Sequence, residues 1–85
     1  MAGYLWGKIK GESSSTDATL AIGSEQTLDL EKNAGNDYWQ YSTAVSAGNY
    51  DCTAKDVTSG SGGNEETKNA SVYDNQWTEL NFDIS

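Results

Sequence analysis

The sequence has no histidine, no arginine and a single cysteine, and these absences exclude several kinds of site. Without histidine, and with Cys52 alone, the chain cannot assemble a zinc site or a cysteine–histidine nucleophile pair. One cysteine cannot form an internal disulfide, so this is not a small secreted scaffold held by bridges. We therefore expect a non-enzyme with no catalytic, cofactor-binding or metal-binding residues, in which Cys52 packs as a small hydrophobe.

Phosphate-cradling and acid–base motifs are also missing. The glycines between Gly60 and Gly63 lack the lysine and the following helix of a phosphate-binding loop. The neighbouring carboxylates of Glu65 and Glu66 lie in a polar stretch, where we expect them to be solvated rather than catalytic. Oxygen-rich turns at 36–37 and 64–66 leave calcium binding open, although their spacing matches no known loop signature.

Positive charge is scarce, with five lysines against 13 acidic residues and a formal net charge of −8. Such a field repels phosphate backbones and anionic lipid, so nucleic acid is a poor partner. No apolar stretch approaches the roughly 18 residues of a membrane helix, and no basic leader precedes an apolar run. We expect no membrane insertion and no signal peptide. The chain is either an intact small product or a domain with Met1 added.

The residues that are present favour strands and turns. Aromatic residues make up 11% of a chain that is only 35% hydrophobic, so a few large rings must supply much of the core. The central stretch 41–54 reads as a hairpin. Tyr50, Cys52 and Ala54 alternate with polar residues in its second strand, which is the period of a half-buried strand. We expect Gly48 to turn the chain with a positive φ, where valine would be strained by more than about 2 kcal/mol.

The same alternation runs through most of the chain, and we expect one domain over residues 1–85 with flexible loops at about 12–17 and 58–66. The fold expected is all-β, a seven-stranded antiparallel Greek-key β-sandwich that is Ig-like or transthyretin-like. Strands are expected at 3–11, 18–22, 26–31, from 38 to the turn before 48, and at 49–57, 68–73 and 77–84. Their inward residues should include Leu5, Ile9, Ala18, Leu20, Ile22, Leu28, Leu30, Trp39, Tyr41, Ala70, Val72, Leu80, Phe82 and Ile84.

Three large rings fall on the outward positions of this pattern: Tyr4, Trp6 and Trp77. Two interpretations are open. The rings cover one end of the sandwich or a neighbouring strand, or they form a contact surface for a partner. These three residues are the candidate partner contacts.

Four segments resemble a known family. They are Gly7-Lys8-Ile9-Lys10-Gly11, Ala18-Thr19-Leu20-Ala21-Ile22, Val45-Ser46-Ala47-Gly48-Asn49-Tyr50-Asp51-Cys52-Thr53-Ala54 and Gln76-Trp77-Thr78-Glu79-Leu80-Asn81-Phe82-Asp83-Ile84. Together they resemble a carboxypeptidase regulatory-like domain, whose Leu-Pro-Ala-Gly-Xaa-Tyr turn is matched at Ala47, Gly48 and Tyr50. Val45 and Ser46 replace the leucine and proline. The pair Trp39 and Tyr41 lies one residue further from the turn than in that family, so a bulge or a longer loop is expected.

The resemblance implies a seven-stranded transthyretin-like sandwich with a non-catalytic, accessory role. We expect a structural subunit displayed in many copies on a virion or an extracellular assembly, as a capsid decoration protein or a filament subunit. Its partner would be a protein, either another copy or a capsid or appendage subunit. The alternative is a carbohydrate-binding or adhesion module whose exposed rings stack on a polysaccharide.

Overall fold

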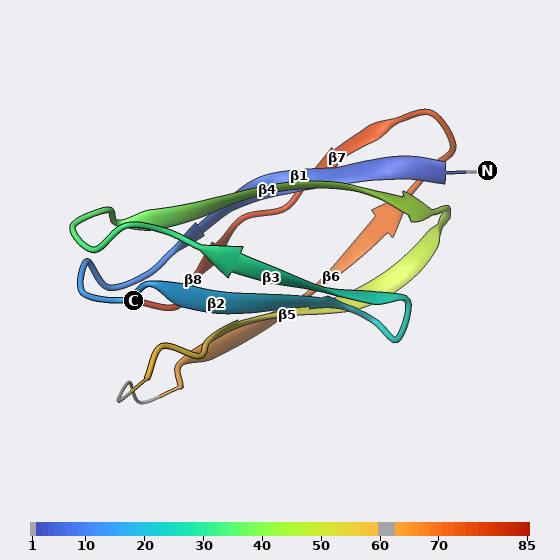
Figure 1. Cartoon of the computed structure of the whole chain (residues 1–85). Coiled ribbons are helices and arrows are strands. Elements are labelled where there is room, and N and C mark those ends of the chain that lie inside the picture. The colour runs from blue at the N-terminus through green and yellow to red at the C-terminus, as the bar shows by residue number, and fades with distance from the viewer. Residues whose placement is uncertain (1, 60–62) are drawn as a thin grey trace.

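The computed structural model describes residues 2–59 and 63–85, and that part of the chain contains strands and no helix (Figure 1). The strands are β1 (Ala2–Lys10), β2 (Asp17–Ile22), β3 (Gln26–Glu31), β4 (Tyr38–Ser46), β5 (Gly48–Asp56), β6 (Glu65–Val72), β7 (Trp77–Glu79) and β8 (Phe82–Asp83). All of the expected strands are present, with ends shifted by a few residues. The predicted strand over 77–84 is divided into β7 and β8.

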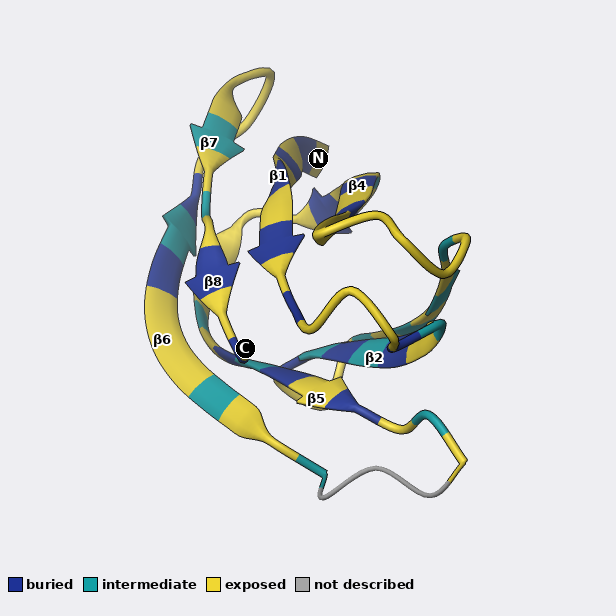
Figure 2. Cartoon of the chain, turned by 90° about the vertical axis from the view of Figure 1, so that its left-hand side faces the viewer, coloured by how far each residue is buried: buried dark blue, intermediate teal, exposed yellow. Residues whose placement is uncertain are grey.

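The strands form two sheets that pack against each other. Sheet A has the order β4-β1-β7, with β8 also paired to β1, and sheet B has the order β3-β2-β5-β6 (Figures 1 and 2). The all-β, two-sheet prediction is confirmed. The prediction of an entirely antiparallel sheet is wrong, because β7 and β8 pair with β1 in parallel. After β6 the chain crosses from sheet B to sheet A and runs beside β1 in the same direction.

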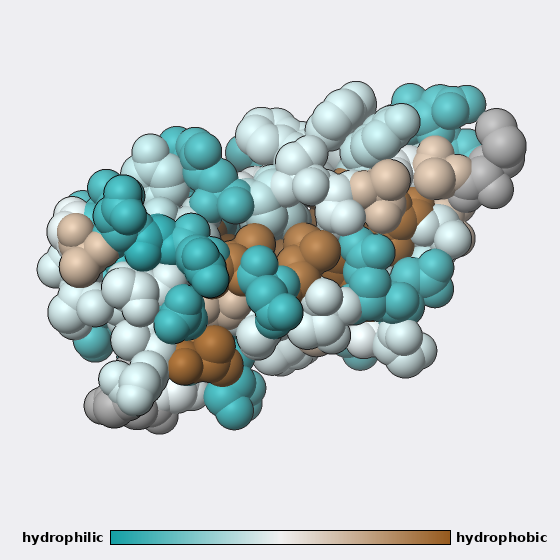
Figure 3. Space-filling model, viewed as in Figure 1, coloured by the Kyte–Doolittle hydropathy of each residue, from teal (hydrophilic) through white to brown (hydrophobic). Residues whose placement is uncertain are grey.

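The core follows the predicted alternation. In β1 every second residue is buried, and Leu5 and Ile9 are fully enclosed. Trp39 and Tyr41 in β4 point into the same core, as does the fully buried Cys52 of β5. Leu28 and Leu30 are only partly buried, because β3 is an edge strand. Figure 3 shows hydrophobic residues in a band across the middle of the molecule, between polar ones.

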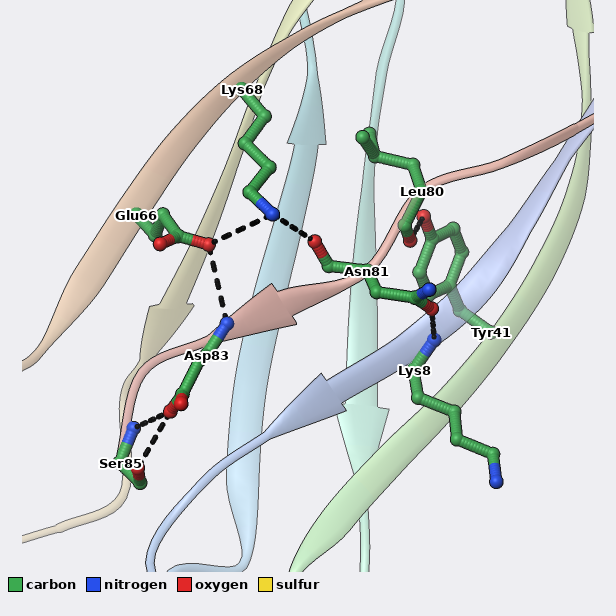
Figure 4. Close-up of polar contacts among 8 residues, drawn as sticks. All are labelled: Lys8, Tyr41, Glu66, Lys68, Leu80, Asn81, Asp83 and Ser85. Atoms are coloured by element: carbon green, nitrogen blue, oxygen red, sulfur yellow. Dashed lines mark hydrogen bonds and ion pairs between the residues drawn. The ribbon is translucent and has the colours of Figure 1, made fainter.

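The contacts of Leu80 explain why the predicted strand over 77–84 is interrupted between β7 and β8. Its N–H donates to the carbonyl of Trp6 at 2.8 Å, and its own carbonyl accepts the Tyr41 hydroxyl at 2.5 Å. The Leu80 carbonyl packs directly on Gly7, where a Cβ would overlap its oxygen and lie 2.8 Å from its carbon. At the next position the side chain of Asn81 accepts the N–H of Lys8 at 2.9 Å, in place of a backbone partner (Figure 4).

Replacing Tyr41 by phenylalanine should therefore destabilise the domain by about 1 to 2 kcal/mol, because the Leu80 carbonyl loses its donor inside the sandwich. Burial of the Tyr41 ring also raises the pKa of its hydroxyl, so the group is a donor at any ordinary pH. Urea unfolding followed by tryptophan fluorescence measures the change. A urea midpoint equal to that of the parent would show that this hydrogen bond does not stabilise the chain between β7 and β8.

Three expectations about the stretch from β4 to β5 are wrong. The two strands do not form the predicted hairpin, because β4 pairs with β1 in sheet A whereas β5 pairs with β2 and β6 in sheet B, so the chain crosses between the sheets here. Gly48 does not have the expected positive φ, which is found instead at Gly23, Gly35, Gly63 and Asn75 among the described residues. Gly48 is the first residue of β5 and its φ is not positive, so valine at position 48 is not forced into a left-handed conformation. The bulge or longer loop expected near Trp39 is also missing, because β4 pairs with β1 without interruption from Ser46 to Tyr38.

The polar segment 12–17 is anchored more firmly than its composition suggests. Ser15 is 2% exposed, and its hydroxyl donates to the buried carboxylate of Asp56 at the end of β5. The ammonium of Lys32 donates to the carbonyls of Glu12, Ser15 and Asn36 and lies 4.9 Å from the centre of the Trp39 ring. In the other predicted loop, residues 60–62 lie outside the described residues and 65–66 belong to β6.

Candidate functional site: the outer aromatic face

The three predicted contact residues lie on one face of sheet A. Tyr4 and Trp6 occupy outward positions of β1, and the parallel register places Trp77 of β7 directly beside Tyr4. Their exposed fractions are 37%, 39% and 61%, so all three are accessible. We call the surface formed by Tyr4, Trp6, Tyr38 and Trp77 the outer aromatic face.

Tyr4 and Trp77 are stacked on each other. Their ring centres are 4.5 Å apart and their planes differ by 18°. Stacked aromatic pairs of this kind are favourable beyond the area that they bury, so each ring is held in place before any partner arrives. Of the two ring faces of Trp77, one is therefore occupied by Tyr4. Since β7 is an outer strand of sheet A, the other face of Trp77 is the exposed one.

Tyr38 belongs to the same face and was not among the predicted contacts. It is 43% exposed, and the ammonium of Lys8 lies 4.6 Å from its ring centre. The sequence did contain a signal for it, because placing Trp39 and Tyr41 in the core leaves Tyr38 on the outward side of the strand. A hollow of about 310 Å³ opens beside Trp6, lined by Trp6, Gly7, Lys8, Gln40 and Tyr41.

Charge is distributed unequally between the two sides of the sandwich. On the outer aromatic face, β1 and β4 carry only Lys8 and Lys10 as outward charged side chains, while Glu79 and Asp83 follow on β7 and β8. The outward charged residues of sheet B are Asp17, Asp29, Glu31, Asp51, Lys55 and Glu65. The ring-bearing side is therefore the less acidic side of a strongly acidic molecule.

Cys52 and Glu66 lie away from the outer aromatic face. Burial and, to a lesser extent, the nearby Asp51 raise the pKa of the Cys52 thiol, which keeps it protonated and weakly nucleophilic. Glu66 accepts the N–H of Asp83 at 3.2 Å and lies 3.6 Å from the ammonium of Lys68 (Figure 4). Within 2–59 and 63–85, no three acidic or cysteine side chains converge as metal ligands.

Comparisons with family models, curated proteins and solved structures found no match for the chain. Across the described ranges, no helix is long and apolar enough to span a membrane.

Proposed function

We propose that the chain is a non-catalytic structural subunit, displayed in many copies on a surface assembly, that docks through its outer aromatic face. The assembly would be a virion, where the chain decorates the capsid, or an extracellular filament. The observation that carries the proposal is the Tyr4–Trp77 stack beside Trp6, three accessible rings on one rigid sheet. Rigid tryptophan and tyrosine side chains dominate the binding energy of protein interfaces, since they lose little conformational entropy on docking.

The partner surface is a protein with an apolar recess and carboxylates at its rim. The recess would take the rings, and the carboxylates would meet Lys8 and Lys10 beside them. The acidic outer side of sheet B would face away from the assembly. In that position it repels neighbouring free copies and keeps them soluble before docking.

A polysaccharide is the second candidate, and the hollow beside Trp6 favours it. Sugar rings stack on exposed aromatic faces, and here Trp6, Gln40 and Lys8 border one recess. The Tyr4–Trp77 stack weighs against this candidate, because those two rings cover one another's faces instead of presenting both to a ligand.

The finer fold assignment belongs to the same proposal. We place the chain among transthyretin-like sandwiches of the carboxypeptidase regulatory-like kind, with β7 and β8 as one interrupted seventh strand. Both β7 and β8 lie alongside β1 in the same direction, which supports that count, and so do the crossings between sheets after β1, β3, β4 and β6. An accessory role without catalysis is what such a resemblance implies.

Replacing Trp77 by alanine should leave the fold intact and weaken docking by at least about tenfold, since the lost ring is accessible and belongs to the anchor cluster. The tagged full chain is expressed in its source cell, and the fraction that elutes with high-mass material is measured by size exclusion with light scattering. Val57→Ala is the matched control, because Val57 is 45% exposed and lies outside sheet A.

Three results would contradict the docking proposal. One is a parent chain that never elutes with larger material. Another is a Trp77→Ala variant that incorporates as well as the parent. The third is binding of the purified monomer to arrayed polysaccharides that Trp6→Ala abolishes, which would transfer the function to the second candidate. A collapse of the far-ultraviolet circular dichroism of Trp77→Ala would show that the ring is part of the core.

A further inference from the structure

The four outer strands of the two sheets differ in how they are protected from pairing with another chain. Exposed strand edges pair readily unless they are short, charged or interrupted. In sheet A, β7 has three residues and ends at the Leu80 break. In sheet B, the edge strand β3 carries Asp29 and Glu31, and β6 carries two glutamates and a lysine. The nine residues of β4 include no charge, no proline and no glycine.

The hydrogen bonds of β1 show which backbone groups of β4 face away from β1, toward the free edge of the sheet. The even-numbered residues of β1 bond toward β7 and β8, as shown by the bonds of Tyr4, Trp6 and Lys10. Because bonding direction alternates along a strand, the odd-numbered residues of β1 bond to β4, and in the observed register these meet the odd-numbered residues of β4. The N–H and C=O groups at even positions therefore point to the free edge: Tyr38, Gln40, Ser42, Ala44 and Ser46. At Ser46 the carbonyl already accepts the Tyr50 hydroxyl at 2.6 Å, so the N–H is the group left for pairing there.

We propose that this edge pairs with the same edge of a second copy, antiparallel, about a two-fold axis at Ser42. Full overlap of 38–46 places Ser42 opposite Ser42, Gln40 opposite Ala44 and Tyr38 opposite Ser46. Each of these pairs joins two edge-facing positions, which is what an antiparallel ladder requires. A register shifted by one residue would instead place edge-facing groups opposite groups already bonded to β1.

Side-chain size and charge favour a second copy as the occupant. The larger outward residues Tyr38 and Gln40 would meet the small Ser46 and Ala44, so the outward rows fit without collision. Two chains that each carry a net charge of −8 repel each other, and of β3, β4 and β6, the longer outer strands within 2–59 and 63–85, only β4 carries no carboxylate. A hollow of about 620 Å³ lies beside the start of β4 and leaves space for a second chain. It is lined by Glu31, Lys32, Asn33, Asn36, Tyr38, Trp39 and Gln40.

Pairing of this kind would join two copies of sheet A into one continuous sheet. Since the two-fold axis is perpendicular to the sheet, both outer aromatic faces would lie on the same side of the dimer. The pairing uses backbone groups of β4, whereas docking uses rings on the sheet surface, so the dimer does not depend on the proposed docking function.

The test is the mass of the purified full chain, measured by sedimentation equilibrium over a range of concentrations. The parent is expected to reach about twice its 9.1 kDa mass. Ser42→Lys should remain monomeric at concentrations where the parent is dimeric, because the axis would bring two ammonium groups together. Thr27→Lys is the matched control, an exposed position on β3 given the same charge, and it should dimerise like the parent.

A second variant separates edge pairing from a general charge effect. Ser42→Pro removes an N–H that points away from β1, so the monomer should fold while the dimer is lost. A parent that stays monomeric at its highest soluble concentration would overturn the proposal. Either Ser42 variant keeping the parent's dimeric mass would overturn it as well. If Trp77→Ala dimerises normally but fails to dock, the two proposals are independent.

Discussion

Replacing Gly7 by alanine is expected to destabilise the domain by about 3 kcal/mol or more. A side chain that overlaps backbone atoms inside a sandwich cannot be accommodated by a small side-chain movement. A Cβ at this position overlaps the Leu80 carbonyl, which is backbone and accepts the Tyr41 hydroxyl. The N–H of Leu80 is held as well, because it donates to the Trp6 carbonyl. To make room, the chain between β7 and β8 must move away from β1. That movement breaks the parallel pairing and uncovers the residues that follow it.

Urea unfolding of Gly7→Ala against Gly48→Ala measures this effect with a matched control. Gly48 is also a strand glycine, but it is exposed, and a Cβ there would lie 3.2 Å from the Tyr50 hydroxyl, the far end of a side chain. We expect Gly48→Ala to change stability by less than about 1 kcal/mol. Equal losses in the two variants would mean that the Leu80 carbonyl does not lie against Gly7.

Replacing Asp56 by alanine is expected to cost about 2 to 4 kcal/mol, since buried polar partners are then left without a hydrogen bond. The carboxylate is 3% exposed and accepts the Ser15 hydroxyl and, at 2.9 Å, the N–H of Thr58. The Thr58 hydroxyl in turn accepts the N–H groups of Thr16 and Asp17, both at 3.0 Å. Removing the carboxylate therefore loosens the end of β5 and the segment leading into β2 together.

Asp29→Ala is the control for Asp56→Ala, because it removes an exposed carboxylate from β3 and lowers the net negative charge equally. Its urea midpoint should match the parent's. Limited proteolysis adds a local readout, since cleavage within 12–17 should accelerate in Asp56→Ala alone. If Asp56→Ala unfolds at the same urea concentration as Asp29→Ala, the buried carboxylate is not what anchors this segment.

Side-chain alternation was sufficient to predict most of the core. Buried residues such as Leu20, Trp39 and Cys52 each belong to a strand in which apolar residues occupy every second position. This pattern arises because one face of each strand in a two-layer fold must be apolar. The Ser15–Asp56 contact was not predictable in this way, because both residues are polar and 41 positions apart. The break at Leu80 depends on Gly7 and Tyr41 from two other strands, so nothing near Leu80 in the sequence indicates it.

The candidate site was predicted in its residues but not in its geometry. Outward positions followed from alternation for Tyr4, Trp6 and Trp77, and all three are exposed. Their gathering on one face depends on β7 lying parallel to β1, which the antiparallel expectation did not contain. Sequence periodicity describes each strand separately, whereas register and neighbour order arise from packing of the whole chain.

The most direct test of the central claim is the solvent accessibility of Trp6 and Trp77 in the free and the assembled chain, measured by hydroxyl-radical footprinting with mass spectrometry. Both rings should be oxidised readily in the free chain and protected in high-mass material, with Trp39 low in both states. Labelling of Lys55 on sheet B should stay unchanged. Protection of sheet B with Trp6 and Trp77 still fully reactive would contradict docking through the outer aromatic face.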